Sequence, residues 1–273
     1  MKTKIKISLC QMKVVDDKNR NILKAIEMIY RSAQNNADVI LLPEMFNCPY
    51  DNSKFCNYAE NVETGETIKA IKKAAKELEV CVIAGSIPEA SGGKLYNTCV
   101  AVDNKGNILG THRKVHMFDI NIPGKIEFKE SATLNSGNEI TVVDTDICKI
   151  GIAICYDVRF PEMFRIMALR GAQIVVIPAA FNMTTGPLHW ELLMRTRAVD
   201  NQVFIAAVSP ARDEKANYVA YGNSMVIDPF ARVLGRLEAK EDILFTDIDL
   251  SEIDKTRKEL PLLKHRREDV YKV

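Results

Sequence analysis

The stretch that decides the fold is KIGIAICYDVRFPEMFRIMALRGAQIVVIP, residues 149–178. Two apolar, β-branched runs within it, Lys149–Cys155 and Ile174–Pro178, have the length and composition of β-strands. Between them an amphipathic helix is predicted over Pro161–Arg170, opened by its proline and ended by Gly171. Because the run IVVIP has no polar position, we expect strands buried on both faces with helices packed outside them.

Short strands alternate with amphipathic helices along the rest of the chain. Further helices are predicted over Lys18–Asn35, Thr67–Leu78 and Leu188–Ala198, and a hairpin over Asn97–Arg113 turns at a glycine. No linker or internal repeat interrupts the pattern, which predicts a single α/β domain over residues 1–273. The charged tail, residues 251–273, is expected to be solvated or to form a subunit contact. The other predicted strands are Lys4–Gln11, Val39–Pro43, Val80–Ser86, Asn97–Asp103, Val203–Ser209, Ser224–Asp228 and Ile243–Asp249.

The composition excludes several classes of function. The 273 residues include 37 Lys+Arg and 36 Asp+Glu, so there is no net basic charge to attract nucleic acid or an anionic membrane. No apolar run approaches the ~18 residues of a membrane-spanning helix, and the start of the chain lacks the apolar core of a signal peptide. The seven cysteines form no CxxC pair. We therefore expect a cytoplasmic protein with reduced thiols.

Three short segments carry residues suited to catalysis. Glu44 directly follows the apolar run VILLP, where partial desolvation would raise the pKa of its carboxyl towards the range of a general base. The alternative is a solvent-facing glutamate at the end of a strand. Lys114 lies in THRKVHMFD, where its ammonium could stabilise an oxyanion, although a surface lysine is the simpler interpretation. His112 and His116 have no carboxylate or cysteine at ligand spacing, so no metal and no cofactor are predicted.

The third segment, GIAICYDVRFPE, places Cys155 where a strand turns into a helix. Such a turn exposes a nucleophile at the edge of a sheet and directs backbone N–H groups towards the substrate oxygen. A buried structural cysteine is the alternative.

Together LLPEMF, HRKVHMFD and GIAICYDVRFPE resemble the Glu, Lys and Cys signatures of the carbon–nitrogen hydrolase, or nitrilase-like, superfamily. Glu130 in PGKIEFKES matches the second glutamate of that family. The stretches PAAFNMTTGPLHWELLMRTRAVDNQVFIAAVSPAR and YGNSMVIDPFARVLG are most similar to its omega-amidase branch. The resemblance implies a four-layer αββα sandwich that forms a homodimer or a larger homo-oligomer.

The resemblance also implies a mechanism. Glu44 would take the thiol proton of Cys155, and the thiolate would attack an amide carbonyl to form a thioester that water hydrolyses. Lys114 and the backbone N–H of Tyr156 would stabilise the oxyanion. Glu130 would orient Lys114 and the substrate amide.

Omega-amidases act on 2-oxo dicarboxylic acid monoamides such as 2-oxoglutaramate and 2-oxosuccinamate. Arg159 would hold the substrate carboxylate, unless it forms a salt bridge with Asp157 or Glu162. The other expected substrate-binding residues are Tyr50, Tyr156, Phe181 and Thr185.

Other functions remain open on the sequence alone. The chain could act on deaminated glutathione or an N-carbamoyl compound. It could also be a non-catalytic scaffold that kept the fold, or a redox sensor in which Cys48 or Cys56 takes part.

Overall fold

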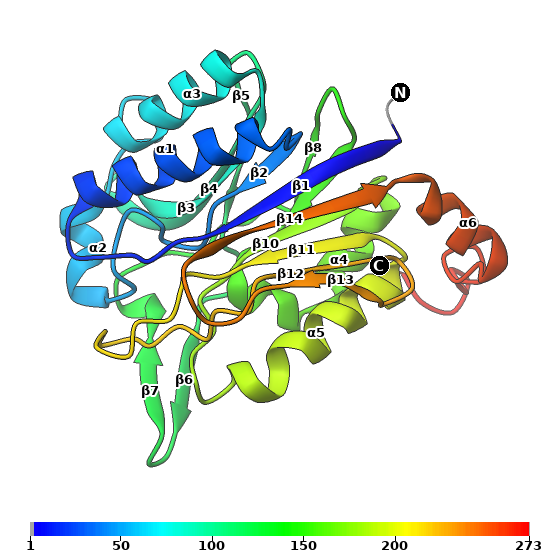
Figure 1. The fold of residues 1–273 in the computed structure, drawn as a ribbon. Helices are drawn as coiled ribbons and strands as arrows, with labels where there is room; N and C mark the ends of the chain where they lie inside the picture. Colours follow the sequence, from blue (N-terminus) through cyan, green and yellow to red (C-terminus); the bar gives the residue numbers. More distant parts are fainter. Residues whose placement is uncertain (1–2, 273) are drawn as a thin grey trace.

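The computed structural model describes residues 3–272, which form two six-stranded sheets packed face to face (Figure 1). In spatial order the first sheet contains β14 (Asp242–Asp249), β1 (Lys4–Gln11), β2 (Val39–Leu41), β3 (Cys81–Ser91), β4 (Lys94–Val102) and β5 (Ile108–Arg113). The second contains β13 (Val233–Arg236), β12 (Met225–Ile227), β11 (Phe204–Val208), β10 (Ile174–Pro178), β9 (Lys149–Ile152) and β8 (Thr141–Asp144).

Helices cover the outer face of each sheet (Figure 1). The first sheet carries α1 (Lys18–Gln34) and α3 (Glu66–Leu78), and the second carries α4 (Pro161–Leu169) and α5 (Gly186–Asn201). The predicted four-layer αββα sandwich is therefore confirmed. The remaining elements are α2 (Asn52–Tyr58), α6 (Ser251–Glu259), the hairpin β6 (Asp119–Ile122) and β7 (Ile126–Lys129), and the short 3-10 helices η1 (Glu130–Ala132) and η2 (Cys155–Arg159).

The apolar run of β2 shows why strands of this fold need no polar face. Val39 and Leu41 pack in the core between the sheets, whereas Ile40 and Leu42 pack in the core under α1 and α3. Successive side chains of a strand point to opposite faces, so each position meets a hydrophobic layer. All four side chains are fully buried, as the sequence predicted.

The strand directions bring distant residues to one edge of the sandwich. Strands β1, β2 and β3 run parallel, and so do β9, β10 and β11. The carboxyl ends of parallel strands lie at the same edge of a sheet. Glu44 follows β2, Cys155 follows β9 and Ala180 follows β10, so the loops that carry them can meet there.

Most predicted elements are present with small shifts of their ends, but one prediction needs correction. The strand predicted over Lys149–Cys155 ends at Ile152, and Cys155 begins η2 with a backbone φ of +46°. The reason is local, since a side-chain oxygen of Asp157 accepts the backbone N–H of Ile154 at 3.0 Å and bends the chain out of the sheet.

The hairpin predicted over Asn97–Arg113 is confirmed by antiparallel pairing of β4 with β5. Its turn requires glycine, because Gly106 has a φ of +80° and a Cβ there would lie 2.7 Å from the Lys72 carbonyl oxygen. The hairpin of β6 and β7, which projects from the end of the sandwich, was not predicted from the sequence (Figure 1). Within residues 3–272 no helix has the length and apolar character needed to cross a membrane.

A pair of leucine substitutions tests the packing of the two sheets. Leu41→Ala removes a fully buried side chain from the core between them and should lower the free energy of unfolding by about 2–5 kcal/mol. Leu23→Ala, at a position on α1 that is 70% exposed, should change it by less than about 0.5 kcal/mol. Urea denaturation measures both values, and equal losses would contradict the assigned packing.

Candidate active site

Lys114 is the centre of a buried ion network. It follows the last residue of β5, and its Nζ lies 3.0 Å from Oε1 of Glu44 and 2.8 Å from Oε2 of Glu130. All three side chains are fully buried, so the alternative of a surface lysine is wrong. Burial alone would lower the pKa of Lys114, but the charges of Glu130 and Glu44 outweigh it and hold this pKa well above its ordinary value.

Both oxygens of Glu44 are held by hydrogen bonds. The backbone N–H of Ala180 donates to Oε2 at 2.7 Å, and Nδ2 of Asn97 donates to Oε1 at 2.8 Å. Burial raises the pKa of Glu44 above its ordinary value, an effect that Lys114 opposes and Glu130 reinforces. A solvent-facing glutamate is therefore excluded, and the carboxylate has the raised proton affinity of a general base.

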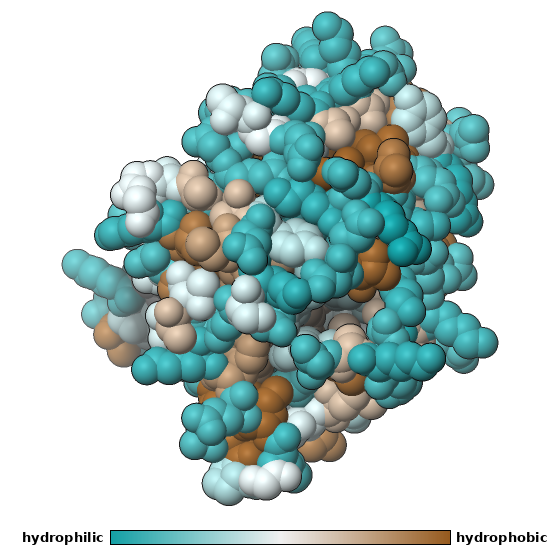
Figure 2. All heavy atoms as spheres, turned by 90° about the vertical axis from the view of Figure 1, so that its left-hand side faces the viewer, coloured by the Kyte–Doolittle hydropathy of each residue, from teal (hydrophilic) through white to brown (hydrophobic). Residues whose placement is uncertain are grey.

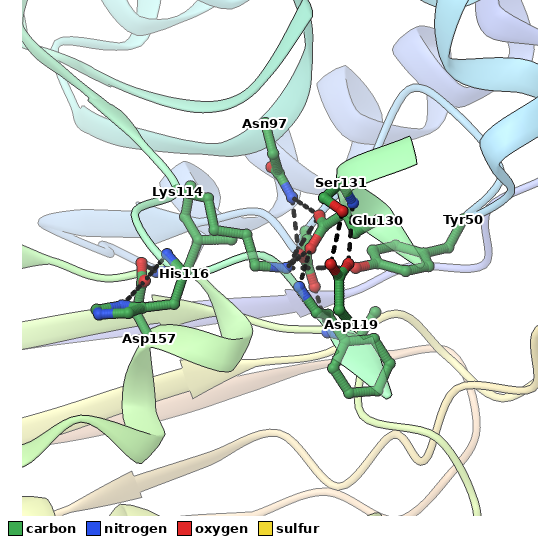
Figure 3. Close-up of polar contacts among 12 residues, drawn as sticks. Tyr50, Asn97, Lys114, His116, Asp119, Glu130, Ser131 and Asp157 are labelled. Atoms are coloured by element: carbon green, nitrogen blue, oxygen red, sulfur yellow. Dashed lines mark hydrogen bonds and ion pairs between the residues drawn. The ribbon is translucent and has the colours of Figure 1, made fainter. Parts of the chain in front are cut away.

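Glu130 enters the network from η1, directly after the β6–β7 hairpin. Its Oε2 accepts the backbone N–H of Phe118 at 2.7 Å, from the segment that precedes the hairpin. Its Oε1 accepts from Lys114 at 3.0 Å and from Asn97 at 3.2 Å. Figure 3 shows Asn97, Lys114 and Glu130 converging, with the ring of Tyr50 beside them.

Cys155 adjoins this network on the turn from β9 into η2. Burial and the Glu44 carboxylate raise the pKa of its thiol well above the ordinary value, and Lys114 lowers it. The nearby backbone of Ala180 also lowers this pKa. The thiol is thus protonated at rest beside a base. The φ of +46° is a costly conformation for a residue with a side chain, and such strain is concentrated at functional sites.

Asp157 connects the turn of Cys155 to the segment of Lys114. Its carboxylate receives the backbone N–H of His116 at 2.9 Å, Nδ1 of His116 at 2.8 Å and Nε2 of His112 at 3.2 Å, besides the backbone of Ile154. Burial by itself would raise the pKa of Asp157, but these hydrogen bonds outweigh it and hold the pKa well below the ordinary value. Both histidines thus form hydrogen bonds with the Asp157 carboxylate. Residues 3–272 contain no cluster of His, Cys, Asp and Glu suited to a metal ion.

Tyr50 lies at the edge of the network. Nζ of Lys114 donates to its hydroxyl at 3.3 Å, and its ring packs 4.7 Å from the ring of Tyr218. A cavity of about 360 Å³ is lined in part by Glu44, Tyr50 and Tyr218. The face that carries α2 and the β6–β7 hairpin is hollowed among mainly hydrophilic residues (Figure 2).

Arg159 lies between two aromatic rings. Its guanidinium carbon is 5.4 Å from the ring centre of Tyr156 and 5.2 Å from that of Phe181. Nη1 contacts Nδ1 of His189 at 3.3 Å, and the buried Nε has no hydrogen-bond partner in the described chain. No ion pair joins Arg159 to a carboxylate within residues 3–272, so a salt bridge with Asp157 or Glu162 is excluded for the free protein.

Thr185 stands apart from these contacts. It precedes α5, and its hydroxyl lies 3.3 Å from Oδ1 of Asn182. In the described chain the side chain of Thr185 makes no hydrogen bond to the end of α5 and none to the ion network, whereas Glu44, Lys114, Glu130 and Cys155 converge.

Sequence reasoning missed three residues around the site. Asn97 bridges the two glutamates, Tyr218 donates its hydroxyl to the Ala180 carbonyl at 2.6 Å, and His189 contacts Arg159. The available signal for Asn97 was weak, a polar residue close to the apolar run CVAV of the same strand. Tyr218 and His189 gave none, because their partners are distant in the chain.

Comparisons with known proteins agree with this geometry. The model of the carbon–nitrogen hydrolase family matches residues 6–258. The chain belongs to the carbon–nitrogen hydrolase family. The hydrolase is 48% identical over 268 residues to "Omega-amidase NIT2" of Mus musculus, covering 98% of this chain and 97% of that relative. It is also 48% identical to "Omega-amidase, chloroplastic" of Arabidopsis thaliana, covering 99% of this chain and 74% of that relative.

Solved structures give the same result. The hydrolase is similar to Saccharomyces cerevisiae Nit3, described as a member of branch 10 of the nitrilase superfamily. The TM-score is 0.90 at 36% identity, and the match covers 98% of each chain. Both comparisons span nearly the whole chain, so the family extends across both sheets.

Asp157→Asn tests the clamp at the Cys155 turn. Because folding lowers the pKa of Asp157, its stabilising effect is present above the unfolded pKa of ~3.9 and is lost as the pH falls below it. The variant should be less stable by about 3 kcal/mol at a pH of about 5, and the difference should narrow near pH ~3. Urea denaturation at both pH values measures it. Asp144→Asn, at a position with a side chain 76% exposed, is the control, and a pH-independent difference for Asp157→Asn would contradict the assignment.

Proposed function

We propose that this hydrolase is an omega-amidase that hydrolyses the side-chain amide of 2-oxo dicarboxylic acid monoamides, such as 2-oxoglutaramate and 2-oxosuccinamate. The observation that carries the proposal is Arg159, a cation four residues beyond Cys155 that has no carboxylate partner in the described chain. The names of the Mus musculus and Arabidopsis thaliana relatives support the same activity.

In the first half-reaction Glu44 accepts the proton of the Cys155 thiol while the sulfur attacks the amide carbon. Burial raises the pKa of both groups. The proton transfer moves one negative charge from the carboxylate to the sulfur and adds no further charge to the buried site. The carbonyl oxygen becomes an oxyanion that Lys114 and the backbone N–H of Tyr156 stabilise. Glu44 then returns the proton to nitrogen, the C–N bond breaks, and ammonia leaves a thioester on Cys155.

In the second half-reaction water replaces ammonia. Glu44 takes a proton from the water, and the hydroxyl oxygen attacks the thioester carbon. The C–S bond breaks, the sulfur regains the proton from Glu44, and the new carboxylic acid gives its remaining proton to solvent and leaves as the dicarboxylate. Throughout both steps Glu130 holds Lys114 by their contact of 2.8 Å and orients the substrate amide.

The far end of the substrate gives the selectivity. A carboxylate can accept two parallel N–H groups from Arg159, whose planar guanidinium is held between the rings of Tyr156 and Phe181. Tyr50 adds a hydroxyl next to Lys114. Thr185 remains a candidate for the same subsite, although its contact with Asn182 requires its hydroxyl to turn on binding.

Arg159→Met tests the carboxylate subsite. The loss of two charge-assisted hydrogen bonds should lower kcat/KM for 2-oxoglutaramate by about 100-fold or more. The kcat/KM for butanamide, which has no carboxylate for Arg159 to bind, should fall by less than about threefold, because the substitution leaves the residues of the chemical step unchanged. The exposed Arg195→Met on α5 is the matched control. Equal losses on both amides would show that Arg159 acts on the fold and not on the substrate.

Cys155→Ala tests the covalent mechanism. The variant should form no 2-oxoglutarate above the uncatalysed rate and no acyl adduct with substrate, whereas the wild type should gain the mass of the acyl group in an acid-quenched turnover. Values of kcat/KM on 2-oxoglutaramate, deaminated glutathione and an N-carbamoyl amide separate the three candidate substrates. An unlabelled wild-type Cys155 would favour the scaffold alternative.

We further propose a homodimer or larger homo-oligomer located in the cytoplasm. Leu188 and Leu192, 71% and 63% exposed, lie one turn apart on α5, which gives this outer layer an apolar surface suited to a second copy. The charged tail, residues 251–273, is a second candidate for the contact. All seven cysteines are free, which supports a reducing compartment and gives no sign of a disulfide between Cys48 and Cys56.

A further inference from the structure

Asn97 contacts both carboxylates of the ion network and the backbone of its lysine. It is fully buried on β4, and its Nδ2 lies 2.8 Å from Oε1 of Glu44 and 3.2 Å from Oε1 of Glu130. Its backbone carbonyl accepts the N–H of Lys114 at 2.8 Å, which fixes where the lysine leaves β5. One residue thus holds both carboxylates and the backbone of the cation between them.

The orientation of the Asn97 carboxamide follows from charge. Carboxylate oxygens only accept hydrogen bonds, so the NH₂ group must face the two glutamates. The Oδ1 atom is then buried with no hydrogen-bond partner in the described chain. A buried acceptor without a partner is unfavourable, so the value of the carboxamide at this position lies in the donor group that it presents to the two glutamates.

The network also needs a donor that carries no charge. Two carboxylates share one ammonium, which leaves a net negative charge in a buried region. A second cation there would neutralise Glu44 and weaken it as a base, whereas an apolar side chain would remove a donor that the two carboxylates share. A carboxamide supplies two N–H groups without changing the charge.

We propose that Asn97 is a positioning residue, which holds the Glu44 and Glu130 carboxylates around Lys114 so that Glu44 stays ionised and aligned with the Cys155 thiol. The role applies to the shared hydrolytic chemistry and does not depend on which amide is the substrate. The ionisable groups that face Glu44 are Lys114 after β5, Glu130 of η1, Cys155 of η2, Tyr50 of the loop before α2, and Tyr218 of the loop after β11.

The sign of the expected pH effect follows from the hydrogen bond. A donor to a carboxylate favours its charged form, so removing the donor raises the pKa of Glu44. Proton transfer from Cys155 needs Glu44 ionised, which places that pKa on the acid limb of the kcat/KM profile. The loss of one bond to a charged group corresponds to a shift of about one pH unit.

The experiment compares Asn97→Leu, which keeps the volume but has no donor, with Asn97→Asp, which keeps the shape and adds a carboxylate. Asn97→Leu should move the acid limb of the kcat/KM profile to higher pH by about one unit. Asn97→Asp should move it to still higher pH, because a third carboxylate repels the charge of Glu44. Cys99→Ala, two positions along the same strand and fully buried, should lower stability without moving the limb.

A second readout is independent of the substrate. The pH dependence of Cys155 alkylation by iodoacetamide, followed by mass spectrometry of the Cys155 peptide, reports the same proton transfer in the full chain. It should shift in the same direction and order as kcat/KM. If the folded Asn97→Leu protein keeps the wild-type limb in both measurements, the proposal is wrong and Asn97 serves packing. A chain that alkylates as expected but hydrolyses no 2-oxo amide would overturn the proposed substrate and leave the role of Asn97 supported.

Discussion

The desolvated ammonium of Lys114 is the constraint on which the rest of this site depends. A charge removed from water is tolerated only when opposite charges and hydrogen bonds surround it. Its partners Glu44 and Glu130 lie 70 and 16 residues away in the chain. The network can therefore exist only when the end of β2, the end of β5 and the segment after the β6–β7 hairpin are all in place. The ion network consequently depends on tertiary structure that joins distant parts of the first sheet.

The second sheet contributes the proposed nucleophile, Cys155, through a strained turn. Cys155 has a positive φ in a turn where the Asp157 carboxylate accepts the backbone N–H of Ile154, and the same carboxylate accepts the backbone N–H of His116. Asp157 thus connects the sheet that carries the nucleophile to the segment that carries the lysine. The reacting groups come from both halves of the sandwich, which explains why the inter-sheet core matters for the chemistry as well as for stability.

Much of the fold was predictable because strand and helix patterns are local. The run VILLP indicated a strand between two hydrophobic layers, and Pro161 with Gly171 marked the helix that follows Cys155. The β6–β7 hairpin was missed because its short strands are half-exposed and its exposed turn lies beyond the sandwich. The end of β9 was placed too late, because the Asp157 carboxylate accepts the backbone N–H of Ile154 and bends the chain away from the sheet. The hydrophobic pattern of a strand contains no information about such a bond.

The sequence by itself determined the residue types and their places at strand ends, and hence the chemistry of a cysteine nucleophile with an acid–base partner. It also determined the family, through three motifs that are specific in combination. Only the tertiary structure decided that Lys114 is buried, that Arg159 has no carboxylate partner in the described chain, and that Asn97 bridges two glutamates. The physical reason is that desolvation and ion pairing depend on distances in space, which the chain sets only when both sheets have formed.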